Sequence, residues 1–108
     1  MPTAASPAEL AELRAELEAA FEARATLDAG AIEKLRPRVE RAMALLESGQ
    51  ARVAEPSDAG WMVNQWLKKA VLLYFRCNDM RLMDAGSPGP FWDKVPTRFK
   101  GFSAEDFR

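Results

Sequence analysis

The chain contains few side chains that could carry out chemistry, and they are widely spaced. Its 108 residues include no histidine and a single cysteine, Cys77. Without an imidazole, a Ser-His-Asp or Cys-His nucleophile, a histidine proton shuttle and the common histidine-containing zinc sites are excluded. Cys77 follows an apolar segment and has no candidate base beside it in the sequence. We therefore interpret it as a packed thiol rather than a nucleophile.

The carboxylates and glycines form no recognisable site either. Asp79, Asp84 and Asp93 lie near predicted loops, but their spacing matches neither a metal-binding loop nor a catalytic pair. Solvated or capping roles explain them better. The six glycines are isolated, so the sequence lacks a phosphate-binding loop and a dinucleotide-binding fingerprint. We predict no catalytic, cofactor-binding or metal-binding residue in this chain.

Charge and hydropathy argue against two further kinds of partner. Fifteen basic and sixteen acidic residues leave a net charge of -1, without the basic excess that binds a phosphate backbone. No apolar run is long enough to span a bilayer, and the single thiol fits a reducing compartment. We expect a cytoplasmic protein with neither nucleic-acid nor membrane partners.

A pair of lysines beside a tryptophan has the composition of an anion-binding patch. Lys68 and Lys69 follow Trp66 near the start of a predicted helix, where the helix dipole makes cations mildly unfavourable. We interpret the lysines as the exposed arc of that helix and Trp66 as part of the core. The alternative is that the lysines are kept for contact with a phosphate or with a partner protein.

The front half of the chain is predicted to be mainly helical, with amphipathic helices over residues 1–50. Ser6, Pro7 and Glu9 form a capping box with proline at the first helical position, and the helix extends to about Arg24. Apolar residues recur every three or four positions, which places them on one stripe. They are Leu10, Leu13, Leu17 and Phe21.

The second helical segment is predicted to begin after Asp28 and to end at Gly49, which suits a left-handed cap. Pro37 interrupts the pattern, and we expect either a fresh helix start or a kink there because proline inside a helix costs about 3 kcal/mol. The apolar stripe consists of Ile32, Leu35, Val39, Met43 and Leu46. Two antiparallel helices would bury these stripes against each other; a groove for a partner helix is the alternative.

Residues 51–77 are predicted to form a β-hairpin and a buried helix. The hairpin occupies residues 51–64, with residues 56–60 as its turn. Asn64 is a candidate cap for the helix over residues 65–77, which is apolar on nearly all sides in its second half. Such a helix is buried on more than one side, so we expect it at the centre of a small α+β domain.

Residues 78–108 are predicted to form an irregular and extended tail. We expect a short strand over residues 80–84, a turn over residues 86–90 and an extended edge segment over residues 91–99. Five aromatic side chains either cover a core within the chain or await another domain or subunit. They are Phe91, Trp92, Phe99, Phe102 and Phe107. Residues 103–108 carry the pattern of a beginning helix, from which we expect the chain to be part of a longer protein.

Several segments together resemble the N-terminal region of bacterial tetrahydrodipicolinate N-succinyltransferase. The most specific is residues 65–76, QWLKKAVLLYFR. The others are residues 44–49 (ALLESG), 52–55 (RVAE), 78–79 (ND) and 91–96 (FWDKVP). The resemblance covers about residues 40–108 and extends less specifically to the alanine-rich helices that precede them.

The resemblance implies an acyltransferase of the diaminopimelate route to lysine. Such an enzyme moves succinyl from succinyl-coenzyme A to the amine of ring-opened tetrahydrodipicolinate. A helical N-terminal domain precedes a left-handed parallel β-helix of hexapeptide repeats, and the active sites lie between the β-helices of a homotrimer. Those repeats are absent from this chain, and the family's catalytic and ligand-binding residues lie beyond residue 108. The resemblance therefore assigns no catalytic or binding residue here.

Three functions follow, in decreasing order of support. The first is a non-catalytic N-terminal domain of such an acyltransferase, whose partner is the β-helix domain of the same protein. The second is a free-standing helical module that binds a partner protein through the helix seam or the aromatic tail. The third is nucleic-acid binding through a set of basic residues. They are Lys68, Lys69, Lys94, Arg98 and Lys100.

Overall fold

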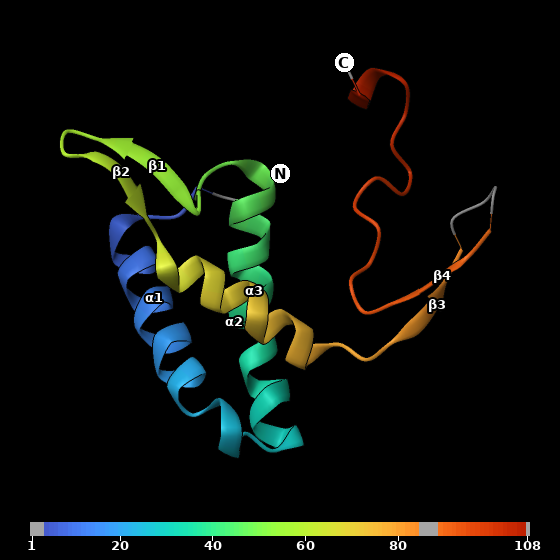
Figure 1. Ribbon diagram of the computed structural model, residues 1–108, viewed down its shortest axis with the longest axis horizontal. Coiled ribbons are helices and arrows are strands. Elements are labelled where there is room, and N and C mark those ends of the chain that lie inside the picture. The colour runs from blue at the N-terminus through green and yellow to red at the C-terminus, as the bar shows by residue number, and fades with distance from the viewer. Residues whose placement is uncertain (1–3, 85–88, 108) are drawn as a thin grey trace. The chain divides into compact units, whose positions relative to one another are not determined.

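The computed structural model describes residues 4–84 and 89–107. It divides the chain into two compact units, Met1–Cys77 and Asn78–Arg108. The first unit contains α1 (Pro7–Glu22), the short 3-10 helix η1 (Arg24–Thr26), α2 (Ala29–Ser48), β1 (Ala54–Ser57), β2 (Gly60–Val63) and α3 (Gln65–Cys77) (Figure 1). The second contains β3 (Arg81–Met83), β4 (Phe91–Asp93) and the short 3-10 helix η2 (Glu105–Phe107). The predicted class, a small and mainly helical α+β fold without a β-helix among the described residues, is confirmed.

Local capping chemistry determines where α1 begins. The Ser6 side chain accepts a hydrogen bond from the Glu9 amide at 3.1 Å, and Pro7 occupies the first turn. The start of a helix has backbone N–H groups without a partner in the helix. Ser6 accepts a hydrogen bond from one of them, and Pro7 has no N–H that needs a partner. The helix buries Leu13 and Leu17 and ends at Glu22, close to the predicted end.

The helix α2 is capped as predicted; of the two predictions for Pro37, the fresh helix start is wrong and the kink stays a prediction. Asp28 accepts a hydrogen bond from the Ala31 amide at 2.8 Å, and Gly49 ends the helix with a left-handed φ of 78°. Between them the helix is continuous over Ala29–Ser48, with Pro37 inside it. The helix buries Val39, Ala42 and Leu45 after the proline. Because this packing depends on the helix continuing, it offsets the cost of one missing backbone hydrogen bond.

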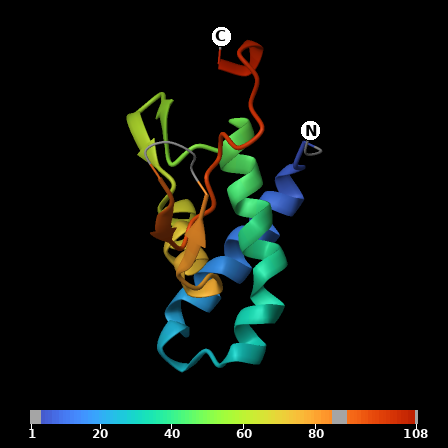
Figure 2. The same cartoon turned by 90° about the vertical axis from the view of Figure 1, so that its right-hand side faces the viewer.

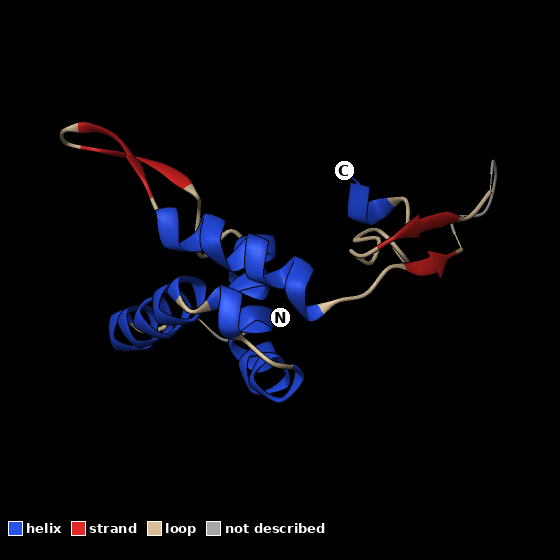
Figure 3. Cartoon of the chain, turned by 60° about the horizontal axis from the view of Figure 1, so that its bottom comes forward, coloured by secondary structure: helices blue, strands red, loops and turns tan. Residues whose placement is uncertain are grey.

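The core of the first unit lies where α3 packs against both α1 and α2. Figure 2 shows α1 and α2 as antiparallel neighbours, and Figure 3 shows α3 lying across the pair. The six largest fully buried side chains come in pairs from the three helices. They are Leu13 and Leu17, Val39 and Leu45, and Leu67 and Leu73. The prediction that α3 is the buried, central helix is therefore confirmed.

The predicted hairpin forms, but its turn is tighter than the sequence indicated. Strands β1 and β2 pair in antiparallel register with Ser57 opposite Gly60, so two residues rather than five form the turn. Pro56 lies within β1, which is tolerated because each strand of a two-stranded sheet has one unpaired edge. Gly60 has a φ of 107°, a conformation that other residues rarely adopt.

In the second unit, β3 pairs with β4 in antiparallel register, with Met83 opposite Phe91. The strand expected over residues 80–84 is thus present, whereas the extended segment expected over residues 91–99 is a strand only as far as Asp93. The turn expected over residues 86–90 falls mainly outside the described residues. The helix expected after Ser103 is, within residues 89–107, the three-residue η2.

Ion pairs join α1 to α2 across their surface. The Arg41 Nε donates to the Glu9 carboxylate at 2.8 Å, and the Arg38 Nε lies 2.7 Å from the Glu16 carboxylate. Glu9 precedes Arg41 by 32 residues, so this contact depends on the antiparallel arrangement of the helices. Among residues 4–84 and 89–107, no helix has the length and apolarity needed to cross a membrane.

Replacement of Pro37 by alanine should stabilise the chain. Alanine restores an amide that can donate to the Glu33 carbonyl, and so removes the cost of about 3 kcal/mol that a proline inside a helix carries. The greater freedom of the unfolded chain reduces this gain by up to about 1 kcal/mol. We expect the free energy of unfolding in urea to rise by about 2 kcal/mol. Pro7→Ala is the control and should change it little, because the first turn of a helix needs no such amide. Destabilisation by Pro37→Ala would contradict this account of α2.

The Glu9–Arg41 pair should make stability depend on pH. The hydrogen bond from Arg41 lowers the pKa of Glu9 below 4.5, so the carboxylate stabilises the fold above that value and this contribution is lost as the pH falls through the lowered pKa. Glu9→Gln should therefore lower the urea midpoint at about pH 6 and have less effect at about pH 3. Glu12→Gln, on the exposed face of α1, is the control. An equal effect of Glu9→Gln at both pH values would rule out the ion pair as its cause.

Candidate functional site

The single thiol of the chain lies in the core. Cys77 is the last residue of α3 and is 5% exposed, and burial raises the pKa of its thiol. Its carbonyl oxygen accepts a hydrogen bond from the Arg36 guanidinium of α2. The nucleophilic form of cysteine is the thiolate, so this environment disfavours reaction at Cys77.

The three aspartates examined in the sequence are all exposed residues of the second unit. Asp93 accepts a hydrogen bond from the adjacent amide of Lys94 at 2.7 Å, which is a local turn contact. Among residues 4–84 and 89–107, no three side chains of cysteine, aspartate or glutamate are grouped as metal ligands. The described structure therefore does not bring Asp79, Asp84 and Asp93 together into a site of that kind.

The lysine pair divides between two environments. Trp66 is buried in the core, as expected, and Lys68 is exposed. Lys69 is half-buried, and its Nζ lies 5.5 Å from the centroid of the Phe21 ring at the end of α1. This cation–π distance was not anticipated from the sequence, because Phe21 is 48 positions away.

Three aromatic residues of the tail contact one another within the second unit. Phe99, Phe102 and Phe107 form a triangle with ring centroids 5.3 to 5.6 Å apart. All three rings are nevertheless exposed, as are Phe91 and Trp92 of β4. Within the second unit these rings therefore cover no core, and both expectations for the tail stay predictions.

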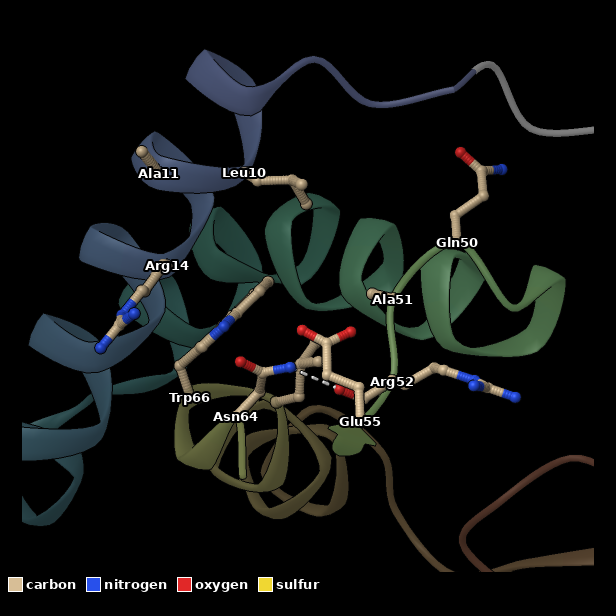
Figure 4. Close-up of a pocket in the computed structure, with 10 residues that line it drawn as sticks. Leu10, Ala11, Arg14, Gln50, Ala51, Arg52, Glu55, Asn64 and Trp66 are labelled. Atoms are coloured by element: carbon tan, nitrogen blue, oxygen red, sulfur yellow. Dashed lines mark hydrogen bonds between the residues drawn. The ribbon is translucent and has the colours of Figure 1, made fainter. Parts of the chain in front are cut away.

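A hollow of about 280 Å3 is the main candidate site of the first unit. It lies between α1, the loop after α2, the hairpin and the start of α3. Figure 4 shows the Glu55 carboxylate and the Asn64 amide at its centre beside the Trp66 ring, with the Arg14 and Arg52 guanidinium groups directed away. The other residues that line it are Leu10, Ala11, Gln50, Ala51 and Leu67. We call this the Glu55 hollow.

Hydrogen bonds hold the walls of the Glu55 hollow in place. The Asn64 side-chain amide donates to the Arg52 carbonyl at 2.7 Å, and the Asn64 backbone amide donates to the Val53 carbonyl at 2.7 Å. Asn64, whose role as a helix cap stays a prediction, thus closes the open end of the hairpin directly before α3. On the opposite wall, Arg14 forms an exposed ion pair with Glu18 at 3.4 Å.

The Glu55 hollow has the groups for binding but few for catalysis. Its lining contains one carboxylate and no cysteine, serine or lysine, so it offers neither a nucleophile with its base nor a pair of carboxylates. Sequence reasoning missed this site because its walls come from three separate segments, residues 10–14, 50–55 and 64–67. No periodic pattern within any one of them indicates a hollow.

The fold defines the class of this chain, and comparison with known proteins gives the family. The class is a small, mainly helical α+β domain. Residues 12–77 match the family model described as tetrahydrodipicolinate N-succinyltransferase N-terminal, a match that spans the helical core of the first unit. The chain belongs to this family, and the resemblance stated from the sequence is confirmed.

The relatives that match carry the name 2,3,4,5-tetrahydropyridine-2,6-dicarboxylate N-succinyltransferase. The protein of Caulobacter vibrioides is 49% identical over 91% of this chain and 37% of its own length. That of Methylobacterium sp. (strain 4-46) is 55% identical over 91% of this chain and 36% of its own length. That of Rhizobium rhizogenes is 50% identical over 95% and 37%. The chain therefore spans little more than a third of these relatives.

Cys77 should react slowly with iodoacetamide in the folded chain. Burial restricts access and raises the pKa of the thiol, and both effects reduce attack by the thiolate. The rate of carboxamidomethylation, measured by mass spectrometry near neutral pH, should rise strongly when urea unfolds the chain. Cys77→Ser should abolish labelling and thus serves as the control. Equal labelling rates with and without urea would contradict a buried Cys77.

Proposed function

We propose that this chain is the non-catalytic N-terminal domain of an N-succinyltransferase of lysine and diaminopimelate biosynthesis. The enzyme transfers succinyl from succinyl-coenzyme A to the amino group of ring-opened tetrahydrodipicolinate. The observation that carries the proposal is the match of residues 12–77 to the N-terminal family model. Identities of 49 to 55% to the succinyltransferases of Caulobacter and Methylobacterium support it.

The chemistry of acyl transfer supports a division of labour within the enzyme. An ammonium group must lose a proton before it attacks a thioester, and the oxyanion that forms needs hydrogen-bond donors. The lining of the Glu55 hollow has a single carboxylate for the first task and a polar neighbour, Asn64, whose amide is already used by Arg52. The proposal therefore places the proton-transfer groups, and the contacts with substrate and coenzyme, in the remainder of the enzyme.

The remainder of the enzyme is also the proposed partner of this domain. It is a left-handed β-helix of hexapeptide repeats in the same protein, assembled as a homotrimer in the cytoplasm. The exposed aromatic rings of the second unit supply apolar surface that such a domain could cover. The chain by itself is proposed to bind no cofactor, and succinyl-coenzyme A is the co-substrate of the whole enzyme.

A free-standing protein-interaction module is the second candidate. The observation in its favour is the hairpin, where Trp61 is 75% exposed and Met62 and Val63 beside it are exposed as well. Large aromatic side chains on a surface are characteristic of protein interfaces. The two candidates differ in the partner that they require. The accessory domain functions only with the rest of the succinyltransferase, whereas the module functions without it.

A chimeric enzyme distinguishes the two candidates. This chain would replace the matched N-terminal part of the Caulobacter succinyltransferase, and release of coenzyme A from succinyl-coenzyme A would be measured with a thiol reagent. An accessory domain should give an active chimera, while the 108-residue chain alone should neither turn over nor bind succinyl-coenzyme A.

An unrelated helical domain of similar length in the same position is the control, and it should give much less activity. Light scattering after gel filtration should show a trimer for the active chimera. An inactive but folded chimera would favour the interaction module. Turnover by the isolated chain would overturn the proposal that this domain is non-catalytic.

A further inference from the structure

A second hollow of the first unit lies between the end of α1, η1 and the C-terminal half of α3. Its volume is about 350 Å3, and it is lined by Phe21, Arg24, Leu72, Leu73 and Arg76. On α3, residues 69, 72, 73 and 76 are spaced three and four apart, so they share one face of the helix. We call this site the Phe21 hollow.

Two cations lie near the aromatic ring of this hollow, and a third is held beside η1. The Arg24 guanidinium carbon lies 4.0 Å from the Phe21 ring centroid, and the Lys69 Nζ lies 5.5 Å from it. Arg76 donates a hydrogen bond to the Arg24 carbonyl at 2.9 Å, which holds its side chain beside η1. The positive charges of α3 and η1 are thus gathered within one small region.

Among the described residues, no carboxylate forms an ion pair with Arg24, Lys69 or Arg76. The arginines of α1 and α2 differ in this respect, because each of them has a glutamate partner. These are Arg14, Arg36, Arg38 and Arg41. Arg24 and Arg76, which line the Phe21 hollow, and Lys69 beside the Phe21 ring therefore have no direct carboxylate partner among the described residues.

The positive groups also have free hydrogen-bonding capacity. Arg24 and Arg76 each use one guanidinium nitrogen to donate to a main-chain carbonyl, at Phe21 and Arg24 respectively. A guanidinium has five N–H donors, so most of them point elsewhere. The carbonyl contacts fix the two side chains in position, which lowers the entropy cost of binding an anion.

The floor of the hollow is apolar. Leu73 is buried, Phe21 is half-buried, and Leu72 is 52% exposed, so that apolar surface lies next to the cationic rim. A volume of this order is at the lower end of the range for small-molecule sites. The combination favours a ligand that has both an apolar body and an anionic group.

We propose that the Phe21 hollow binds a small molecule with an aromatic or alkyl body and one carboxylate, sulfonate or phosphate group. The anionic group lies between Arg24 and Arg76, and the body lies on Leu72 and the Phe21 ring. This site is distinct from the proposed succinyl transfer, which it neither requires nor explains.

The proposal is tested by titrating the 108-residue chain with anilinonaphthalene sulfonate, an aromatic sulfonate whose fluorescence rises on binding. One saturable site is expected, with amide NMR shifts confined to residues around Phe21 and Leu72. Arg24→Gln and Arg76→Gln should each raise the Kd about tenfold, the value of one charge-assisted hydrogen bond. Anilinonaphthalene without the sulfonate should bind much more weakly.

Arg14→Gln is the matched control, since Arg14 is an exposed arginine of α1 that lines the other hollow, and it should leave the Kd unchanged. Arg24→Lys should restore part of the affinity lost in Arg24→Gln, because it keeps the charge. If Arg24→Gln lowered the unfolding temperature but left the Kd unchanged, Arg24 would serve only the end of α1 and the proposal would be overturned. Equal binding of the uncharged analogue, or equal weakening by Arg14→Gln, would overturn it too.

Discussion

The first unit depends on the burial of α3 against two other helices. Helices as short as α3 are marginal in water by themselves, so tertiary packing must supply most of the stabilisation. Leu67 and Leu73 of α3 are fully buried, and α3 contacts both α1 and α2. In α2, Ala42 and Leu45 are buried although they lie outside the stripe predicted for that helix, of which only Val39 is buried. The two surface hollows exist only because this packing brings distant segments to the edges of α3.

Features encoded within a few residues could be predicted from the sequence, whereas those that depend on distant contacts could not. The caps at Ser6, Asp28 and Gly49 are local and occur where expected. That the helix continues through Pro37 could not be predicted, because the cost of the proline is local whereas its compensation, the burial of the residues after it, comes from other helices. The hairpin turn was placed too broadly because Pro56 ordinarily signals a turn, and here it lies in an edge strand.

The sites show the same division between local and distant information. The absence of histidine and the family resemblance could be stated from residues alone, and the family match agrees with that resemblance. Neither hollow could be predicted, because each is lined by segments that are far apart in sequence. Their linings also differ, since that of the first includes a carboxylate and that of the second includes two arginines and no carboxylate.

The two hydrogen bonds of Asn64 have a consequence for how the first unit opens. An isolated two-stranded hairpin is barely stable in water, and here both strands are exposed. Asn64 joins the end of β2 to the Arg52 and Val53 carbonyls at the position where α3 begins. Because these bonds close the hairpin directly beside the first turn of α3, we expect the two to open together in hydrogen exchange.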